Sequence, residues 1–149
     1  MARVESTIQV SKPVEKVFAF LNEAENHARF IPNMAKLTQT SGGAFGQIGA
    51  TARGLLRYLG FINIPVQYQI SEVDPNRSLA MNGKMGPILF KDGYILSPGE
   101  NGSRIKFWLE LNPTGWGAIF RPFAGLIGKI HAQETLRNLK REIHNSVVE

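Results

Sequence analysis

The sequence predicts an α+β fold, in which a strongly curved antiparallel sheet of six to seven strands wraps around a long C-terminal helix. Two short helices are expected after the first strand. Apolar and polar residues alternate at the N-terminus and over most of residues 35–112, which is the period of half-buried strands. The spacing is helical between these stretches and again from about residue 116. Because 149 residues make about one domain, we expect one ligand-binding domain over residues 1–149.

Composition excludes several classes of protein. With 43% hydrophobic and 19% charged residues, the chain can build a core and is not a disordered segment. It contains no cysteine, which excludes disulfides and thiolate metal sites. Arg121 and Lys129 interrupt the longest apolar run, and the first residues lack the apolar stretch of a signal peptide. We therefore expect a cytoplasmic protein.

The net charge of +5 would suit an anionic partner. The basic residues are nevertheless scattered, and their densest group, around Arg137 and Arg141, alternates with Glu134 and Glu142 at helical spacing. Such a pattern is typical of a solvated helix face. We therefore expect no nucleic acid as a partner.

The first three elements follow from the pattern of the N-terminal residues. Alternation up to Val10 predicts a strand that ends before Ser11-Lys12-Pro13. A serine able to cap, a proline in the first turn and an early glutamate predict a helix over Pro13–Glu23. A second short helix is predicted over Glu25–Ile31, because the next residue is a proline.

The middle of the chain is predicted to be a meander of strands. They lie near residues 35–41, 48–58, 61–73, 77–83, 87–97 and 103–112. Alternation is clearest from Phe61 to Ser71, where one face is apolar and the other polar, as in an antiparallel sheet. Residues 74–76 and 98–102 are rich in Pro, Gly and Asn, so they are predicted to be turns.

The segment Trp116–Val147 is predicted to be mostly helix. Its second half has one apolar stripe, formed by Ala132, Leu136, Leu139 and Ile143. Projected back along a 3.6-residue helix, the stripe meets Gly128, Gly125 and Ala118, which are all small. Pro122 can kink this helix or begin it. Small residues facing a curled sheet leave a gap, so we expect an apolar cavity with its mouth near the first half of the helix.

Four segments carry a resemblance to a known superfamily. They are the first strand leading into Ser11–Phe18, the turn Gly46–Gly49, the segment Ile70–Pro75 and the C-terminal run Glu134–Lys140. In this order they resemble the START-like superfamily (SRPBCC, Bet v 1-like or helix-grip), and specifically its polyketide cyclase/dehydrase branch. The resemblance spans nearly the whole chain, although each motif alone is weak. It implies a helix-grip fold with a deep hydrophobic cavity for lipids, sterols, polyketides or hormones, and many members only bind or carry.

Candidate ligand-binding residues share the apolar face of the strands or lie early in the last helix. They are Leu56, Tyr58, Ile64, Val66, Tyr68, Met81, Phe107, Trp116, Phe120, Phe123 and Ile127. Tyr58 and Tyr68 carry phenols that need a hydrogen-bond partner when buried, and that partner is a ligand, water or a backbone carbonyl.

Asp92 and Glu134 are the weak catalytic candidates. Asp92 lies between Phe90 and Tyr94, and burial would raise its pKa into the range of a general acid or base. Its face is not fixed by parity, because Gly93 can mark a bulge, and we expect it to face solvent. Glu134 can present a carboxylate at the cavity end, but we expect it to pair with Arg137 or Arg141.

No metal or cofactor is expected. His27, His131 and His144 lack paired ligand spacing, and we expect each to be a surface or helix-edge residue. The glycines of Gly43–Gly49 lie between two strands rather than before a helix, so they do not form a phosphate loop.

Trp116, Phe120, Phe123, Ile127 and Ile130 together offer more apolar surface than one sheet contact requires. Part of it is then a cavity gate, a homodimer contact or a segment that touches membranes transiently, unless the strands and first helices cover it.

Three functions remain open. The leading hypothesis is a binding protein, with little or no catalytic activity, for a small hydrophobic molecule such as a lipid, a polyketide or another aromatic or isoprenoid compound. The alternatives are an aromatase/cyclase-type enzyme, in which Asp92, Glu134 or a tyrosine moves protons, and a membrane-linked lipid or quinone-binding chaperone.

Overall fold

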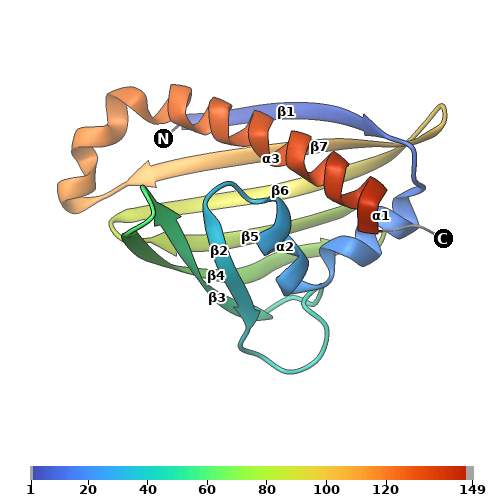
Figure 1. Ribbon diagram of the computed structural model, residues 1–149, viewed down its shortest axis with the longest axis horizontal. Helices are drawn as coiled ribbons and strands as arrows, with labels where there is room; N and C mark the ends of the chain where they lie inside the picture. Colours follow the sequence, from blue (N-terminus) through green and yellow to red (C-terminus); the bar gives the residue numbers. More distant parts are fainter. Residues whose placement is uncertain (1, 147–149) are drawn as a thin grey trace.

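The computed structural model describes residues 2–146 and confirms the predicted α+β fold. Seven antiparallel strands form one open sheet in the order β1-β7-β6-β5-β4-β3-β2. The sheet curves around a long C-terminal helix, as Figure 1 shows. The strands are β1 (Ala2–Val10), β2 (Met34–Gln39), β3 (Thr51–Tyr58), β4 (Ile62–Asp74), β5 (Ser78–Met85), β6 (Ile88–Gly99) and β7 (Gly102–Pro113). All lie within a few residues of the predicted ranges.

Two short helices connect β1 to β2, as predicted, but both differ slightly in length. The helix predicted over Pro13–Glu23 is α1 (Val14–Leu21), with Pro13 at its N-cap position. It stops at Leu21, and the backbone N–H of Asn22 bonds the carbonyl of Phe18. The second helix is α2 (Ala24–Phe30), and it lies over β2.

The C-terminal segment is helical but not one α-helix. Residues Gly115–Phe123 form a 3₁₀-helix, η1, and the α-helix α3 covers Ala124–Ser146. Pro122 has no amide hydrogen for an α-helical bond, and α3 begins just after it. The backward projection of the stripe to Ala118 is therefore wrong, because Ala118 lies in η1. Val147, the predicted end, lies outside the described residues.

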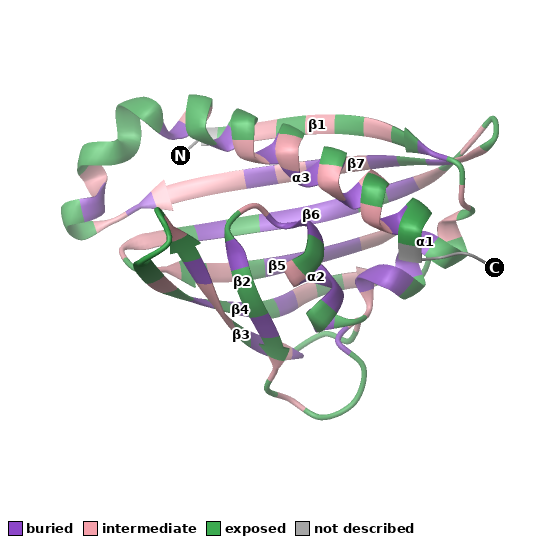
Figure 2. Cartoon of the chain, viewed as in Figure 1, coloured by how far each residue is buried: buried purple, intermediate pink, exposed green. Residues whose placement is uncertain are grey.

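The core lies between the concave face of the sheet and α3. The predicted stripe of Ala132, Leu136, Leu139 and Ile143 is buried. Figure 2 shows the contrast along the helical segment, with buried positions frequent in the second half of α3 and exposed positions dominant in η1.

The two ends of the sheet differ. One end, at the left of Figure 1, carries η1, the β3–β4 turn and the β5–β6 turn, and we call it the mouth end. The opposite end carries α1, the β4–β5 turn and the β6–β7 turn. The exposed side chains at the mouth end are mostly apolar.

Candidate functional site

A cavity of about 640 Å³ lies between the concave face of the sheet and the first half of the helical segment. Its walls come from β3 to β7, η1 and α3, and they are mostly apolar. Gly128 and Ala124 form part of the helix side, so small side chains do leave space there. Gly125, by contrast, is not among the lining residues.

Most of the predicted ligand-binding residues line this cavity. They are Leu56, Tyr58, Ile64, Val66, Tyr68, Trp116, Phe120 and Ile127. Met81 and Phe107 lie in the core outside the cavity lining, and Phe123 is 58% exposed on the surface. That any of these side chains binds a ligand stays a prediction.

Several lining residues were not predicted. They are Ile31, Ile62, Met85, Gly86, Pro87, Ile88, Phe90, Leu109, Leu111, Pro113, Ala124 and His131. Phe90, Leu109 and Leu111 share the inward parity of their strands, so alternation alone marks them. The turn residues 86 and 87 carry no such signal.

Asp92 faces inward, and the expectation that it faces solvent is wrong. It is 6% exposed and lines the cavity. On β6 it shares the inward face with Phe90 and Tyr94, and it lies opposite Met81 of β5 and Leu109 of β7. Both opposite side chains are apolar, and the Oδ1 atom of Asp92 has no hydrogen-bond partner within the described residues.

Burial dominates the electrostatics of this carboxyl group. It raises the pKa of Asp92 from 3.8 to about 8, so the group is mainly a neutral carboxylic acid at neutral pH. Burial also raises the pKa of Tyr68 and Tyr94 well above 10, and the negative charge of an ionised Asp92 adds to both shifts. The interior therefore offers hydrogen-bond donors without fixed charge.

His131 of α3 also lines the cavity and is partly buried, which agrees with the expected helix-edge position but not with an ordinary surface residue. Burial lowers the pKa of its half-buried imidazole, while the charge of Glu134 partly opposes the shift. A neutral imidazole can both donate and accept a hydrogen bond. Glu134 itself does not line the cavity, and its expected partner Arg141 contacts Glu142 instead, at 3.4 Å from Nε to Oε2.

His27 is the clearest departure from expectation, because it is fully buried rather than at the surface. Its Nε2 lies 2.9 Å from the carbonyl oxygen of Leu21 at the end of α1, a group that has no partner inside that helix. Aromatic rings of Phe30, Phe45 and Tyr94 surround it. His144, in contrast, is exposed as predicted, and its Nε2 accepts the backbone N–H of Ser11.

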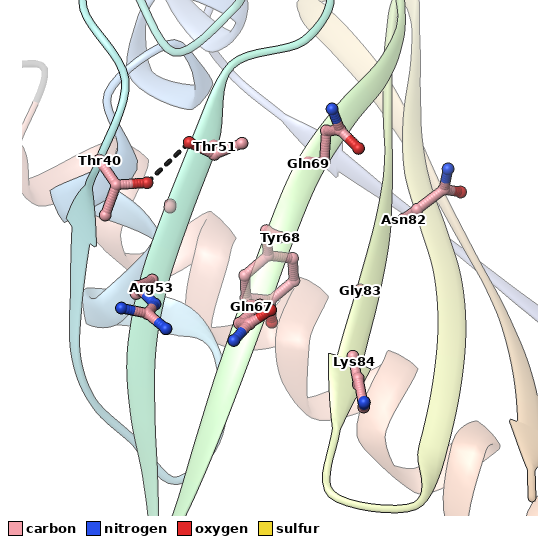
Figure 3. Close-up of a pocket in the computed structure, with 10 residues that line it drawn as sticks. Thr40, Thr51, Arg53, Gln67, Tyr68, Gln69, Asn82, Gly83 and Lys84 are labelled. Carbon is pink, nitrogen blue, oxygen red and sulfur yellow. Dashed lines mark hydrogen bonds between the residues drawn. The ribbon is translucent and has the colours of Figure 1, made fainter.

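A second depression of about 410 Å³ lies on the other face of the sheet, over β3, β4 and β5 (Figure 3). Polar side chains line it, including Arg53, Gln67 and Lys84, and the hydroxyls of Thr40 and Thr51 are 2.7 Å apart. These groups are mostly exposed and open to water. The apolar cavity is less open to solvent and is therefore the better candidate for a binding site.

Two kinds of feature are absent from residues 2–146. No group of three or more metal-ligating side chains comes together there. No helix in that range is both long and apolar enough to cross a bilayer.

Comparison with known proteins gives a consistent picture. A family model described as polyketide cyclase/dehydrase and lipid transport matches residues 1–144. No curated protein matches the sequence. The structural similarity extends over nearly the full chain of several solved proteins.

Three of these solved structures illustrate the range. The Zhui aromatase/cyclase from a Streptomyces species is 14% identical, with a TM-score of 0.79, and the match covers 97% of this chain and 94% of that one. A Thermus thermophilus protein is 13% identical, with a TM-score of 0.76 and 97% of both chains covered. A conserved protein from Geobacillus kaustophilus is 15% identical, with a TM-score of 0.75 and coverage of 97% and 96%. At these identities the similarity shows the fold alone.

Proposed function

Since the chain belongs to the polyketide cyclase/dehydrase and lipid transport family, we propose that its cavity binds a small, mainly apolar molecule that carries a carbonyl or hydroxyl oxygen. The volume of about 640 Å³ lies within the usual range for small-molecule sites, roughly 300–1,000 Å³. The apolar walls supply affinity through the hydrophobic effect. The polar groups inside select the ligand.

The observation that carries this proposal is Asp92. A buried polar atom without a partner destabilises a fold, since its lost contacts with water are not replaced. An oxygen on a ligand would accept the proton of the neutral carboxylic acid and remove that deficit. His131 and Tyr68 line the same cavity and offer further hydrogen bonds.

Ligand titration tests the proposal, with fatty acids, flavonoids, quinones and an environment-sensitive dye as probes. Native mass spectrometry of the purified protein adds any molecule that copurifies. We expect binding of at least one oxygen-bearing apolar probe with micromolar affinity or better. If the protein binds none of them and carries nothing on purification, the proposal is wrong.

Two variants of Asp92 separate the role of the hydrogen bond from that of the apolar walls. Asp92→Asn keeps a donor, so affinity for an oxygen-bearing probe stays within a few-fold of wild type. Asp92→Leu removes the donor and lowers that affinity about tenfold, as expected for a lost buried hydrogen bond. Affinity for a hydrocarbon of the same shape does not fall. Equal losses for both probes would indicate general damage to the cavity instead.

A second candidate function is aldol cyclisation of a polyketide chain, and it rests on two groups that line the same cavity, the imidazole of His131 and the carboxyl group of Asp92. A neutral His131 would take a proton from the carbon next to one carbonyl, and that carbon would attack a second carbonyl. Protonated Asp92 would give its proton to the resulting alkoxide oxygen. One carbon–carbon bond forms, and no oxidant or reductant is needed.

The enzyme hypothesis predicts a different effect of substituting Asp92. Asp92→Asn should abolish turnover of a poly-β-ketone while it leaves binding nearly unchanged, since an amide cannot supply the proton. Unchanged turnover in this variant would exclude Asp92 as the acid. Glu134 is no longer a candidate for this step, because it does not line the cavity.

A further inference from the structure

The mouth end of the sheet carries a dense group of exposed apolar side chains. The most exposed, which we call the mouth patch, are Leu59, Phe61, Trp116, Ile119, Phe123 and Leu126, and they are 58% to 81% exposed. They come from the β3–β4 turn, η1 and the start of α3, which lie at the same end of the molecule in Figure 1. Scattered apolar side chains are normal on a surface, but a group of this size around a cavity mouth indicates a contact surface.

The backbone conformation of Leu59 also indicates a contact surface at the mouth end. Leu59 and Gly60 have φ of 54° and 79°, and the N–H of Phe61 bonds the carbonyl of Tyr58, as in a type I′ hairpin turn. Such turns favour Asn-Gly, because a leucine is strained in the left-handed region. Within residues 2–146 the other non-glycine residues with positive φ are Asn33 and Asn76. A strained leucine that is 81% exposed gains nothing from packing within this chain, so its position fits an external contact.

The charges around the mouth patch have one sign. Between Asn112 and Gln133 the charged side chains are Arg121 and Lys129, and between Gly54 and Ser71 there is only Arg57. All three are exposed. No carboxylate lies in either segment. Two copies of the chain facing each other through this patch would bring these cations together, which disfavours a homodimer and favours an anionic partner.

We propose that the mouth patch docks on the surface of a bilayer that contains anionic lipids. Exposed aromatic and aliphatic side chains beside cations are what an interfacial contact requires. Trp116 of the mouth patch and its neighbour Phe120 in η1 also line the cavity, so docking places the cavity opening against the hydrocarbon layer. An apolar ligand then passes between membrane and cavity without crossing water. The passage of ligand rests on the proposed function, whereas docking itself does not.

Vesicle flotation tests docking directly, with phosphatidylcholine vesicles either pure or containing about one third phosphatidylglycerol. We expect binding to the anionic vesicles, much weaker binding to the neutral ones, and a decrease as salt screens the cations. Trp116 gives a second signal in a Trp108→Phe background. Its emission should shift to shorter wavelength on anionic vesicles, because the indole enters the interface.

The chain offers matched controls for the apolar contacts. Ile119 and Ile48 are 69% and 71% exposed, but Ile48 lies in the β2–β3 loop at the opposite end of the sheet. Ile119→Ser should weaken vesicle binding about tenfold, whereas Ile48→Ser should not change it. Neither side chain lines the cavity, so ligand titration should be unaffected in both. Equal effects of the two variants would overturn the proposal.

Charge is tested in the same way. Lys129→Gln should weaken binding to anionic vesicles about fivefold, and Lys16→Gln on α1 should leave it unchanged. Leu59→Asn should raise the Tm, since asparagine suits the turn, and yet weaken vesicle binding. If Leu59 had only a structural role, the substitution would not raise the Tm while it weakens vesicle binding.

Two outcomes would count against docking. If the patch variants alter only the sedimentation coefficient of the protein, the surface joins copies of this chain. If the protein binds apolar ligands but no vesicle, docking is wrong and the proposed function stands. Vesicle binding without any ligand binding has the reverse meaning, since docking then stands and the proposed function fails.

Discussion

Gly83 of β5 lies directly opposite Phe90 of β6, and the ring of Phe90 occupies the space where a Cβ on residue 83 would stand. Tyr68 of β4 lies on the other side of Gly83 in the same cross-strand row. The rings of Tyr68 and Phe90 meet edge to face above it, with centroids 5.3 Å apart. Both rings line the cavity, so the missing side chain of Gly83 determines how far they project into it.

Gly83→Ala should therefore destabilise the fold and narrow the cavity. The new methyl group displaces Phe90, and overpacking of this kind costs about 1–3 kcal/mol. Urea unfolding measures the loss, and dye titration measures the accompanying fall in affinity. The double variant Gly83→Ala/Phe90→Leu should recover much of the stability, because leucine leaves room for the methyl group. If the losses of stability from the two substitutions were additive in the double variant, the methyl group and the ring of Phe90 would not compete for the same space.

Ala124→Leu should block the cavity without harming the helix. Ala124 is buried and lines the cavity at the start of α3, and leucine is a good helix former. The next residue provides the control, since a Cβ on Gly125 would meet nothing within 4 Å. Gly125→Ala should leave binding unchanged and raise the free energy of unfolding by up to about 1 kcal/mol. Unchanged binding in Ala124→Leu would show that ligands do not use this part of the cavity.

Asp92 should make the fold less stable as the pH rises. In the folded state its pKa is about 8, whereas the unfolded chain releases this proton near pH 3.8. Between these values the folded state holds one more proton, so the free energy of unfolding falls by up to about 1.4 kcal/mol per pH unit. Asp92→Asn removes this contribution. Thermal unfolding of both proteins between pH 4 and 8 measures this contribution. If Asp92→Asn had the same pH dependence of stability as the wild type, Asp92 would not be the group responsible.

His27 should have the opposite effect. Burial lowers its pKa from 6.5 to about 4, so the folded state keeps the imidazole neutral while the unfolded chain takes up a proton. The stability due to the neutral ring is present above pH 6.5 and is lost as the pH falls towards 4. His27→Gln keeps a donor for the carbonyl of Leu21 and removes this loss. A pH profile unchanged by the substitution would contradict the prediction.

The two groups compensate each other in the wild-type protein. Between pH 4 and 6.5 the contributions of Asp92 and His27 have opposite signs, so together they leave stability nearly constant. Each single variant should uncover the contribution of the other group. Asp92→Asn should become more stable as the pH rises through this window, and His27→Gln should become less stable.

The sheet could be predicted from the sequence because alternation over β4 and β7 reflects burial directly. Val66, Tyr68 and Ile70 are all buried, as their parity predicts. The helix stripe was equally clear. Helix limits were less accurate, because Pro122 divides the last segment into two kinds of helix.

The sequence predicts the wrong face for Asp92, and the structure shows why. Asp92 has the same parity as Phe90 and Tyr94, which face inward. The alternation is broken, however, because the next residue, Gly93, is also buried. A Cβ on Gly93 would meet the ring of Trp108 on the outer face, and that cover comes from another strand. Local sequence does not contain this contact, and carboxylates are usually exposed.

Leu59 and His27 also differ from what their residue types suggest, each for its own reason. The left-handed φ of Leu59 follows from the tight turn of three residues, 59–61, between β3 and β4, whereas its residue type would suggest ordinary strand. The burial of His27 follows from the way α2 lies under Tyr94 and beside the end of α1. The burial of His27 thus depends on residues far away in the sequence, whereas the turn at Leu59 is local but has an unusual residue type.

The unfilled space beneath α3 also has a consequence for the lifetime of the protein. A molecule that occupies it stabilises the native state by mass action, while the vacant form unfolds more readily. Degradation in a cell follows the unfolded population. If the cavity binds a ligand as proposed, copies without ligand would be removed first, so turnover itself would match the amount of this protein to the supply of that ligand.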